Sequence, residues 1–330
     1  RRPPRPTLFP YTTLFRSKAT IMGLDSEKLR IRILYGGFLI GVFLLHLAIV
    51  QTQRQYFSDS DGYGYYTLAI RILNGEIASS RQIQKWPPGY PILLIAMNFF
   101  THDYFLAAKL LMAIFGTLYV MSSMLIAHLL LKNHILTFIF GLNICIKTAI
   151  WAVLALITDI PFAFCFQMAI YYLLLGIQAK NSTIPKDDNF PQITSYYHHV
   201  YAGLFTGFAC LLRWTGMILI FIAIILMILP DFFRKGGLIR IFKHSVQTLF
   251  SKQSALFIGF LFGIWSLWLI PNWIIFGSPF HTIIHQEPIL WGPIYAQFDL
   301  EPTQFTSLID VIQIAPILFI KTFLVVFGLH

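Results

Sequence analysis

The chain has 330 residues, of which 57% are hydrophobic, 16% are aromatic and only 12% are charged. Soluble domains carry about 25% charged residues, so this composition excludes a soluble globular protein. Apolar runs of about 20 residues recur along the chain, and the short alternating segments of a membrane barrel do not occur. The sequence therefore predicts an all-α integral membrane protein, built as a polytopic bundle of transmembrane helices.

The formal net charge of +10 at pH 7 is unevenly distributed. Residues 1–17 look like translated sequencing-adapter sequence, and their four arginines, with no acidic residue, leave +6 for the rest. We therefore treat residues 1–21 as a non-native segment with a leader, and residues 22–330 as one membrane domain that starts at Met22. The remaining positive charge lies mainly in loops, which fits a cytoplasmic membrane surface and not nucleic-acid binding.

The first apolar run, residues 31–50, follows a cluster of basic residues, so we expect its start in the cytoplasm and its end outside. Because the basic loop 231–254 should lie inside, residues 200–230 are predicted to make two short passes with Arg213 at the outer turn. The chain ends directly after an apolar run, which suggests that it is incomplete at its C-terminus. The remaining predicted spans cover residues 104–131, 135–153, 162–179, 255–275 and 307–328.

The three cysteines each lie inside an apolar run, without the spacing of a metal or redox site, and are expected to be small buried hydrophobic residues. They are Cys145, Cys165 and Cys210.

The first outer loop, residues 51–103, holds the most polar stretch in the first half of the chain. Cap residues over 58–61 and a stop at Gly75 predict a short helix between them. Residues 92–100 are apolar but too short to span a membrane, which indicates an interfacial or re-entrant segment. We expect the helix that stops at Gly75 to lie in the membrane interface with one apolar face. That face is formed by Tyr66, Ala69, Ile70 and Leu73.

On this topology the acidic residues gather on the outer side, and the inner side receives mostly lysine and arginine. Such a distribution suggests an enzyme that acts where a lipid-linked substrate meets an extracytoplasmic acceptor. The acids at the centre of this interpretation are Asp59, Asp61 and Asp159.

Five short motifs occur in an order that resembles the GT-C membrane glycosyltransferases, in the branch of protein O-mannosyltransferases and aminoarabinose transferases. The resemblance covers roughly residues 31–330, and it depends on the order and spacing of the motifs. The matching stretches are Asp59-Ser60-Asp61-Gly62-Tyr63, Trp86-Pro87-Pro88-Gly89-Tyr90-Pro91, Thr158-Asp159-Ile160-Pro161, Leu212-Arg213-Trp214-Thr215-Gly216 and Phe276-Gly277-Ser278-Pro279-Phe280.

The resemblance implies an inverting transferase that moves a sugar from a polyprenyl-phosphate donor to an extracytoplasmic lipid, glycan or protein. It implies an active site on the outer face of a bacterial inner or plasma membrane. One carboxylate orients and deprotonates the acceptor hydroxyl, and cations stabilise the phosphate, which leaves as an anion without a general acid. This differs from the two-carboxylate scheme of glycosidases.

Asp59 matches the first-loop acid of this family and is our candidate base, although it could instead cap the helix that follows. Asp61 is the second catalytic candidate, or a solvated loop residue. Asp-Ser-Asp also allows a divalent metal, but relatives with an acid before the Pro-Pro pair differ from this chain, which has Gln84 and Lys85 there. No metal ligand is therefore assigned.

The remaining candidates are expected to bind substrate. Arg213 interrupts an apolar run, and it either binds the donor phosphate or extends toward the interface. Asp159 opens a span, where it either orients substrate or caps the helix. Weaker candidates for phosphate binding are Lys147, Lys85 and Arg81. Lys147 could instead extend its charged end to the membrane interface. Tyr63, in the first acidic motif, is also expected to bind substrate.

Three other functions stay open. A transporter or flippase would place ionisable groups in the middle of the membrane, often in repeated halves, and we find no repeat. A non-catalytic assembly subunit would tolerate the loss of Asp59. A ligase or polymerase of surface glycans would share the lipid-linked substrate but would need basic outer loops.

Overall fold

The structure is a computed structural model that describes most of the chain as helix. Its described residues contain α-helices and one 3-10 helix and no strand, which confirms the all-α prediction. The predicted span over 307–328 and the candidates Asp59, Arg81 and Lys85 lie outside these residues. The described residues are 11–52, 60–76, 86–154, 158–181, 190–232 and 246–280.

Four helices are long and apolar enough to cross a membrane, as expected for an integral membrane protein. They are α1 (Tyr11–Thr52, through its part Leu29–Thr52), α5 (Tyr104–Leu131), α7 (Asp159–Asn181, through Asp159–Ala179) and α11 (Lys252–Phe276). Each of these helices covers a predicted span, and α6 (His134–Leu154) covers the predicted span 135–153.

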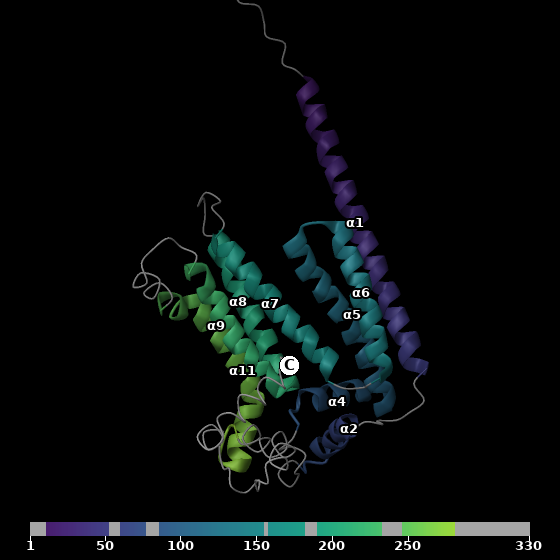
Figure 1. Ribbon diagram of the computed structural model, residues 1–330, viewed down its shortest axis with the longest axis vertical. Helices are drawn as coiled ribbons and strands as arrows, with labels where there is room; N and C mark the ends of the chain where they lie inside the picture. The colour runs from purple at the N-terminus through teal and green to yellow at the C-terminus, as the bar shows by residue number, and fades with distance from the viewer. Residues whose placement is uncertain are drawn as a thin grey trace, which may run out of the picture.

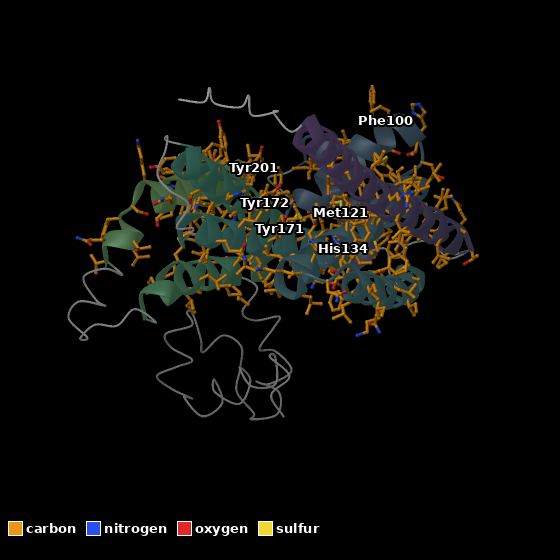
Figure 2. The ribbon with its side chains drawn as sticks, turned by 90° about the horizontal axis from the view of Figure 1, so that it is seen from above. Phe100, Met121, His134, Tyr171, Tyr172 and Tyr201 are labelled. Atoms are coloured by element: carbon orange, nitrogen blue, oxygen red, sulfur yellow. The ribbon has the colours of Figure 1, made fainter. Side chains whose placement is uncertain are left out.

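The helices pack side by side in a bundle (Figure 1). Helix α5 contacts α1, α6 and α7, and α7 in turn packs along α8 (Phe190–Leu212), which packs along α11. Aromatic stacking contributes to the α7–α8 contact, because the rings of Tyr172 and Tyr201 lie 5.0 Å apart at an interplanar angle of 27° (Figure 2). All three cysteines are buried and free, which confirms their assignment as small core residues.

Local sequence signals explain the ends of α5. The carboxylate of Asp103 accepts hydrogen bonds from the backbone N–H groups of Phe105 and Leu106, at 2.8 and 3.4 Å, and so caps the N-terminus of this helix. At its other end Lys132 adopts a left-handed conformation, with φ 50°, and its backbone N–H donates to the carbonyl of His128. The chain then turns tightly into α6, as predicted for residues 132–134.

A neutral polar contact joins α5 to α7 within the bundle. The hydroxyl groups of Ser122 and Ser123 both donate to Oε1 of Gln167, at 2.5 and 3.0 Å. Both serines are buried, so the contact satisfies polar groups that lipid could not. We call Ser122, Ser123 and Gln167 the mid-bundle cluster.

The predicted interruption within residues 200–230 is confirmed. Helix α8 ends at Leu212, and the chain continues through η2 (Trp214–Met217) into α9 (Ile218–Phe232). The backbone approaches itself closely there. A Cβ on Gly216 would lie only 2.6 Å from the backbone carbon of Ala209. The structure contains no membrane, so the side on which this turn lies stays a prediction.

Two shorter helices, α2 (Ser60–Leu73) and α4 (Gly89–Thr101), lie together at one end of the bundle (Figure 1). We call this the site end. Both helices match predicted segments, and Gly75 follows α2 with φ +72°, as a helix stop requires. The predicted apolar face of α2 agrees with the structure only in part. Ala69 is buried and Tyr66 and Ile70 are half-buried, but Leu73 is 57% exposed, and Tyr65 and Leu68 are buried instead.

Candidate functional site

Arg213 occupies the break between α8 and η2. Its backbone is extended, with φ −147° and ψ 143°, so it belongs to neither helix. Its N–H still donates to the carbonyl of Ala209, and its own carbonyl accepts from the N–H of Gly216, both at 2.9 Å. The backbone is thus fixed on both sides while the side chain leaves the helix end.

The guanidinium of Arg213 pairs with the carboxylate of Asp159, the first residue of α7. Nη1 lies 2.5 Å from Oδ1, and the two side chains are 33% and 27% exposed. Nε donates a second hydrogen bond, at 2.9 Å, to Oγ1 of Thr158. Two neighbouring residues at the start of α7 therefore fix the plane of the guanidinium, which a single point contact would not do.

Asp159 is placed favourably for an anion as well. It lies in the first turn of α7, where the helix dipole stabilises negative charge. The first turn of the helix is formed by the N–H of Phe162, which donates to the carbonyl of Thr158 at 2.9 Å. The carboxylate of Asp159 thus lies at the positive end of the helix dipole while it pairs with Arg213. A role at the helix N-terminus and a role in the ion pair are compatible.

Thr158 connects this ion pair to α2. Its side chain is fully buried, and its hydroxyl lies 3.2 Å from the hydroxyl of Tyr65, which is also buried. The ring of Tyr65 in turn packs against Trp86, at 4.8 Å between centroids, and meets Tyr90 edge-on at 5.4 Å. We call Arg213, Asp159, Thr158 and Tyr65 the relay.

Glycines allow the segments around the relay to approach closely. A Cβ on Gly64 would lie 2.5 Å from Nε1 of Trp86, and a Cβ on Gly89 would lie 2.6 Å from the carbonyl oxygen of Leu211. A side chain at position 64 would displace the indole ring of Trp86, and a side chain at position 89 would collide with the backbone of α8. Four of the five sequence motifs thus contribute residues to one region of the fold, at the site end.

The guanidinium of Arg213 stays partly exposed, at 33%, although it is paired with Asp159. The neighbouring indole Nε1 of Trp214 is buried and has no hydrogen-bond partner among the described residues. A partly exposed guanidinium that is held in a fixed plane can bind an anion such as a phosphate.

The structure places the other predicted residues in different positions. Tyr63 is 58% exposed on α2, and its ring packs against Tyr66. Asp61 belongs to the first turn of α2, one helical turn before Tyr65. Lys147 is exposed on α6, and no ion pair among the described residues joins it to the relay. Asp59, Arg81 and Lys85 lie outside the described residues.

Sequence reasoning missed two residues of this region, Thr158 and Tyr65, and one residue of α5, Lys109. Thr158 belongs to one of the five motifs, and Tyr65 belongs to the helix predicted before Gly75. Their polar roles, however, depend on contacts between distant segments. Lys109, in α5, is only 7% exposed, and its Nζ lies 4.5 Å from the ring centroid of Phe105. Its signal was available, since a cation inside an apolar run marks a functional candidate.

No group of three or more histidine, cysteine or acidic side chains that could hold a metal ion occurs among the described residues. Asp59 and the side chain of Asp61 lie outside the described part of the chain, so a divalent metal at the first acidic motif stays a prediction. Comparisons with protein-family models, with curated proteins and with solved structures found no match for this chain.

Proposed function

We propose that this protein is a membrane glycosyltransferase of the GT-C type, which transfers a sugar from a polyprenyl-phosphate donor to an extracytoplasmic acceptor with inversion. The observation that carries the proposal is the fixed and partly exposed guanidinium of Arg213, at the same end of the bundle as α2. The first acidic motif, Asp59 to Tyr63, leads into and begins that helix.

The relay fits the needs of a lipid-phosphate site. A lone arginine near the hydrocarbon region is costly, and the pairing with Asp159 reduces that cost when no substrate is present. A phosphate oxygen can then accept a hydrogen bond from the exposed part of the guanidinium. As the bond between the sugar and the phosphate breaks, negative charge develops on that oxygen, and the fixed cation stabilises it.

The first acidic motif would supply the base. In the proposed step the acceptor oxygen attacks the anomeric carbon from the face opposite the phosphate, and the bonding electrons leave on the phosphate. The acceptor proton passes to the carboxylate of Asp59, with Asp61 orienting the acceptor. Tyr63, Lys85 and Arg81 are proposed to contact substrate beside this acid, while Lys147 is the weakest of the candidates because it is exposed on α6.

One observation favours a second function, a transporter or flippase of a lipid-linked substrate. Lys109 is buried within a helix long enough to span a membrane, and ionisable groups at such positions mark pathways for ions or polar headgroups. A transporter would depend on Lys109 without catalysing sugar transfer.

The test is transfer of radiolabelled sugar from a panel of polyprenyl-phosphate donors in membranes that contain the protein. We expect Asp59→Asn to abolish transfer at equal membrane abundance. The matched control is Asp103→Asn, because Asp103 caps α5 and the same chemical change there removes only a helix cap. Equal losses in both variants would make Asp59 a cap and remove it as the base.

The same membranes separate the two functions. Transfer in the wild type supports the glycosyltransferase, whatever the effect of Lys109→Met. Absence of transfer with every donor, together with uptake or flipping of a lipid-linked sugar that Lys109→Met abolishes, would overturn the proposal in favour of the transporter.

A further inference from the structure

The bundle has another polar cluster at the end opposite the site end, which we call the far end. Helix α5 starts next to α2 and α4, so its last turn and the turn into α6 lie at the far end (Figure 1). The cluster contains His128 of α5, His134 of α6 and Tyr35 of α1, and Lys132 lies in the turn between the two histidines. We call these four residues the far-end cluster.

Contacts from two helices hold the ring of His134 in place. The ring stacks on that of His128, with centroids 4.6 Å apart and an interplanar angle of 25°. On the other helix, the hydroxyl of Tyr35 lies 3.0 Å from Nδ1 of His134. When this hydroxyl donates to Nδ1, the proton of a neutral imidazole is on Nε2, the nitrogen farther from Tyr35. His134 is exposed, so its Nε2–H can donate to a group outside the protein.

Hydrogen bonds within the protein do not satisfy the whole cluster. Nδ1 of His128 is buried and has no hydrogen-bond partner among the described residues. Lys132 is exposed, and its flexible stem allows the ammonium to move toward either histidine. The far-end cluster is therefore not a closed polar network of the kind that packing alone requires, and it presents donors at the protein surface.

The far end is positively charged in the part of the chain that the structure describes. Arg30 and Arg32, one helical turn or more before Tyr35 on α1, are exposed, as is Lys132. Helix α5 is long enough to span a membrane, so the turn at its end lies at the membrane surface. The acidic side chains that the structure describes lie at the site end instead. They are Glu76, Asp103 and Asp159.

We propose that the far-end cluster binds the phosphate of an anionic phospholipid, such as phosphatidylglycerol, in the leaflet at this end of the bundle. The phosphate oxygens accept hydrogen bonds from the ammonium of Lys132 and from Nε2–H of His134. Hydrogen bonds between such donors and a phosphate are charge-assisted, and basic pockets between membrane helices bind anionic headgroups in this way. The acyl chains lie along α6, where Ile135 and Ile139 are exposed. This inference does not depend on glycosyl transfer.

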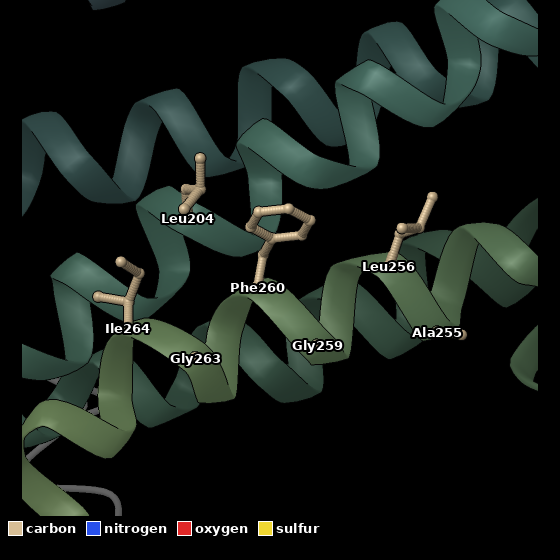
Figure 3. A pocket seen from close by; sticks show the side chains of 7 residues that line it. All are labelled: Leu204, Ala255, Leu256, Gly259, Phe260, Gly263 and Ile264. Carbon is tan, nitrogen blue, oxygen red and sulfur yellow. The ribbon is translucent and has the colours of Figure 1, made fainter.

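Another lipid-facing feature lacks this chemistry. The apolar groove between α8 and α11 has a volume of about 370 Å³, and apolar side chains and glycines line it, among them Leu204, Phe260 and Ile264 (Figure 3). These residues offer acyl chains a surface but give a headgroup no polar side chain. A preference for one headgroup over another therefore reports on the far-end cluster and not on the groove.

The experiment measures binding of fluorescently labelled phosphatidylglycerol to the purified full chain in a neutral detergent. Phosphatidylcholine with the same label is the comparison, because its headgroup contains a phosphate but has no net charge. The test variants are Lys132→Gln and His134→Phe. Their matched controls are Lys252→Gln, which changes an exposed lysine at the start of α11, and His198→Phe, which changes a histidine whose ring stacks on Tyr172.

We expect the wild type to bind phosphatidylglycerol about tenfold more tightly than phosphatidylcholine. Lys132→Gln and His134→Phe should each weaken binding of phosphatidylglycerol about fivefold, as expected for the loss of one basic contact near a membrane surface. The two controls should stay within about twofold of the wild type. Lys132→Arg should bind as the wild type does, because it keeps the charge. Melting temperatures without lipid separate a loss of binding from a loss of folding.

Four results would each overturn the proposal. Equal weakening in Lys252→Gln would show that the lipid responds to the general charge of the far end. Equal affinity for the two lipids would show that no site for an anionic headgroup exists. Loss of binding in Arg213→Gln would place the lipid at the relay. Competition by glycerol phosphate at lipid-like concentrations would make the ligand a soluble phosphate ester, because this compound has the phosphate without acyl chains.

Discussion

The relay and the mid-bundle cluster are both polar contacts between helices, but they differ in charge and exposure. The relay joins a cation and an anion at helix ends, and its two charged side chains are about a third exposed. The mid-bundle cluster joins two buried serines of α5 to Gln167 of α7, without a charge. In this pair of contacts the charged groups lie where a ligand can reach them, and the neutral groups lie inside the bundle.

This difference has a physical basis. A charge in the middle of a bundle loses its hydration, and pairing rarely repays that loss in full. A neutral hydrogen bond between helices contributes less, on average about 0.6 kcal/mol in a membrane, but it leaves no charge to be desolvated. We therefore expect changes in the relay to affect transfer, and changes in the mid-bundle cluster to affect stability alone.

The largest effect is expected from Arg213→Gln. Loss of the cation that faces the donor phosphate should lower transfer about 100-fold or more, as removal of one stabilising donor does in other active sites. The measurement is the rate of sugar transfer at saturating donor and equal membrane abundance. Arg213→Lys should recover part of the rate, because it restores charge without the planar fork.

A double variant separates stability from transfer. Arg213→Gln alone leaves the carboxylate of Asp159 without its cation, whereas Arg213→Gln with Asp159→Asn removes both charges. We expect the double variant to regain the thermal stability lost in the single variant, while transfer stays low. Recovery of transfer in the double variant would show that Arg213 acts only as a structural partner of Asp159.

Asp159→Asn is expected to have the next largest effect. It removes a charge-assisted contact worth about 1.5–3 kcal/mol, so transfer should fall roughly 10- to 100-fold. Because the cation is still present but less firmly held, the loss should appear mainly as a higher KM for the donor. Asp103→Asn, at the start of α5, is the control for loss of an acid at a helix N-terminus. An unchanged KM would argue against a role of Asp159 in orienting Arg213.

Tyr65→Phe should have a smaller effect. The change removes the hydroxyl that meets Thr158 and keeps the ring that packs on Trp86 and Tyr90. One neutral hydrogen bond contributes about 1 kcal/mol, so transfer should fall about fivefold. Tyr66→Phe, at the next position on α2, is the matched control. Equal transfer rates in Tyr65→Phe and Tyr66→Phe would show that the contact between Tyr65 and Thr158 does not affect transfer.

The smallest effect on transfer is expected in the mid-bundle cluster. Gln167→Met keeps the volume of the side chain and removes the acceptor of both serine hydroxyls. We expect a modest loss of thermal stability, on the order of 0.6 kcal/mol, and a transfer rate within about twofold of the wild type. A loss of transfer as large as that of Asp159→Asn would erase the distinction between the two clusters.

The sequence by itself determined the helical class, the approximate spans and the interruption at Arg213. Apolar runs of membrane length, capping residues and a single arginine inside an apolar stretch are local signals, so they can be read without knowing which segments meet. The same signals predicted α2 as a short helix, and the region of α4 as an apolar segment too short to span a membrane. Lys109 belongs to this class of signal, although sequence reasoning passed over it.

Only the tertiary structure decided which residues meet. The pairing of Arg213 with Asp159 joins positions 54 residues apart, and the contact between Tyr65 and Thr158 joins positions 93 residues apart. The buried residues of α2 differ in part from the predicted apolar face for the same reason. Tyr65 is buried because Trp86, Tyr90 and Thr158 surround it, and not because of its own hydropathy. A helix near a membrane surface can bury either of two apolar faces, and its packing partners select one.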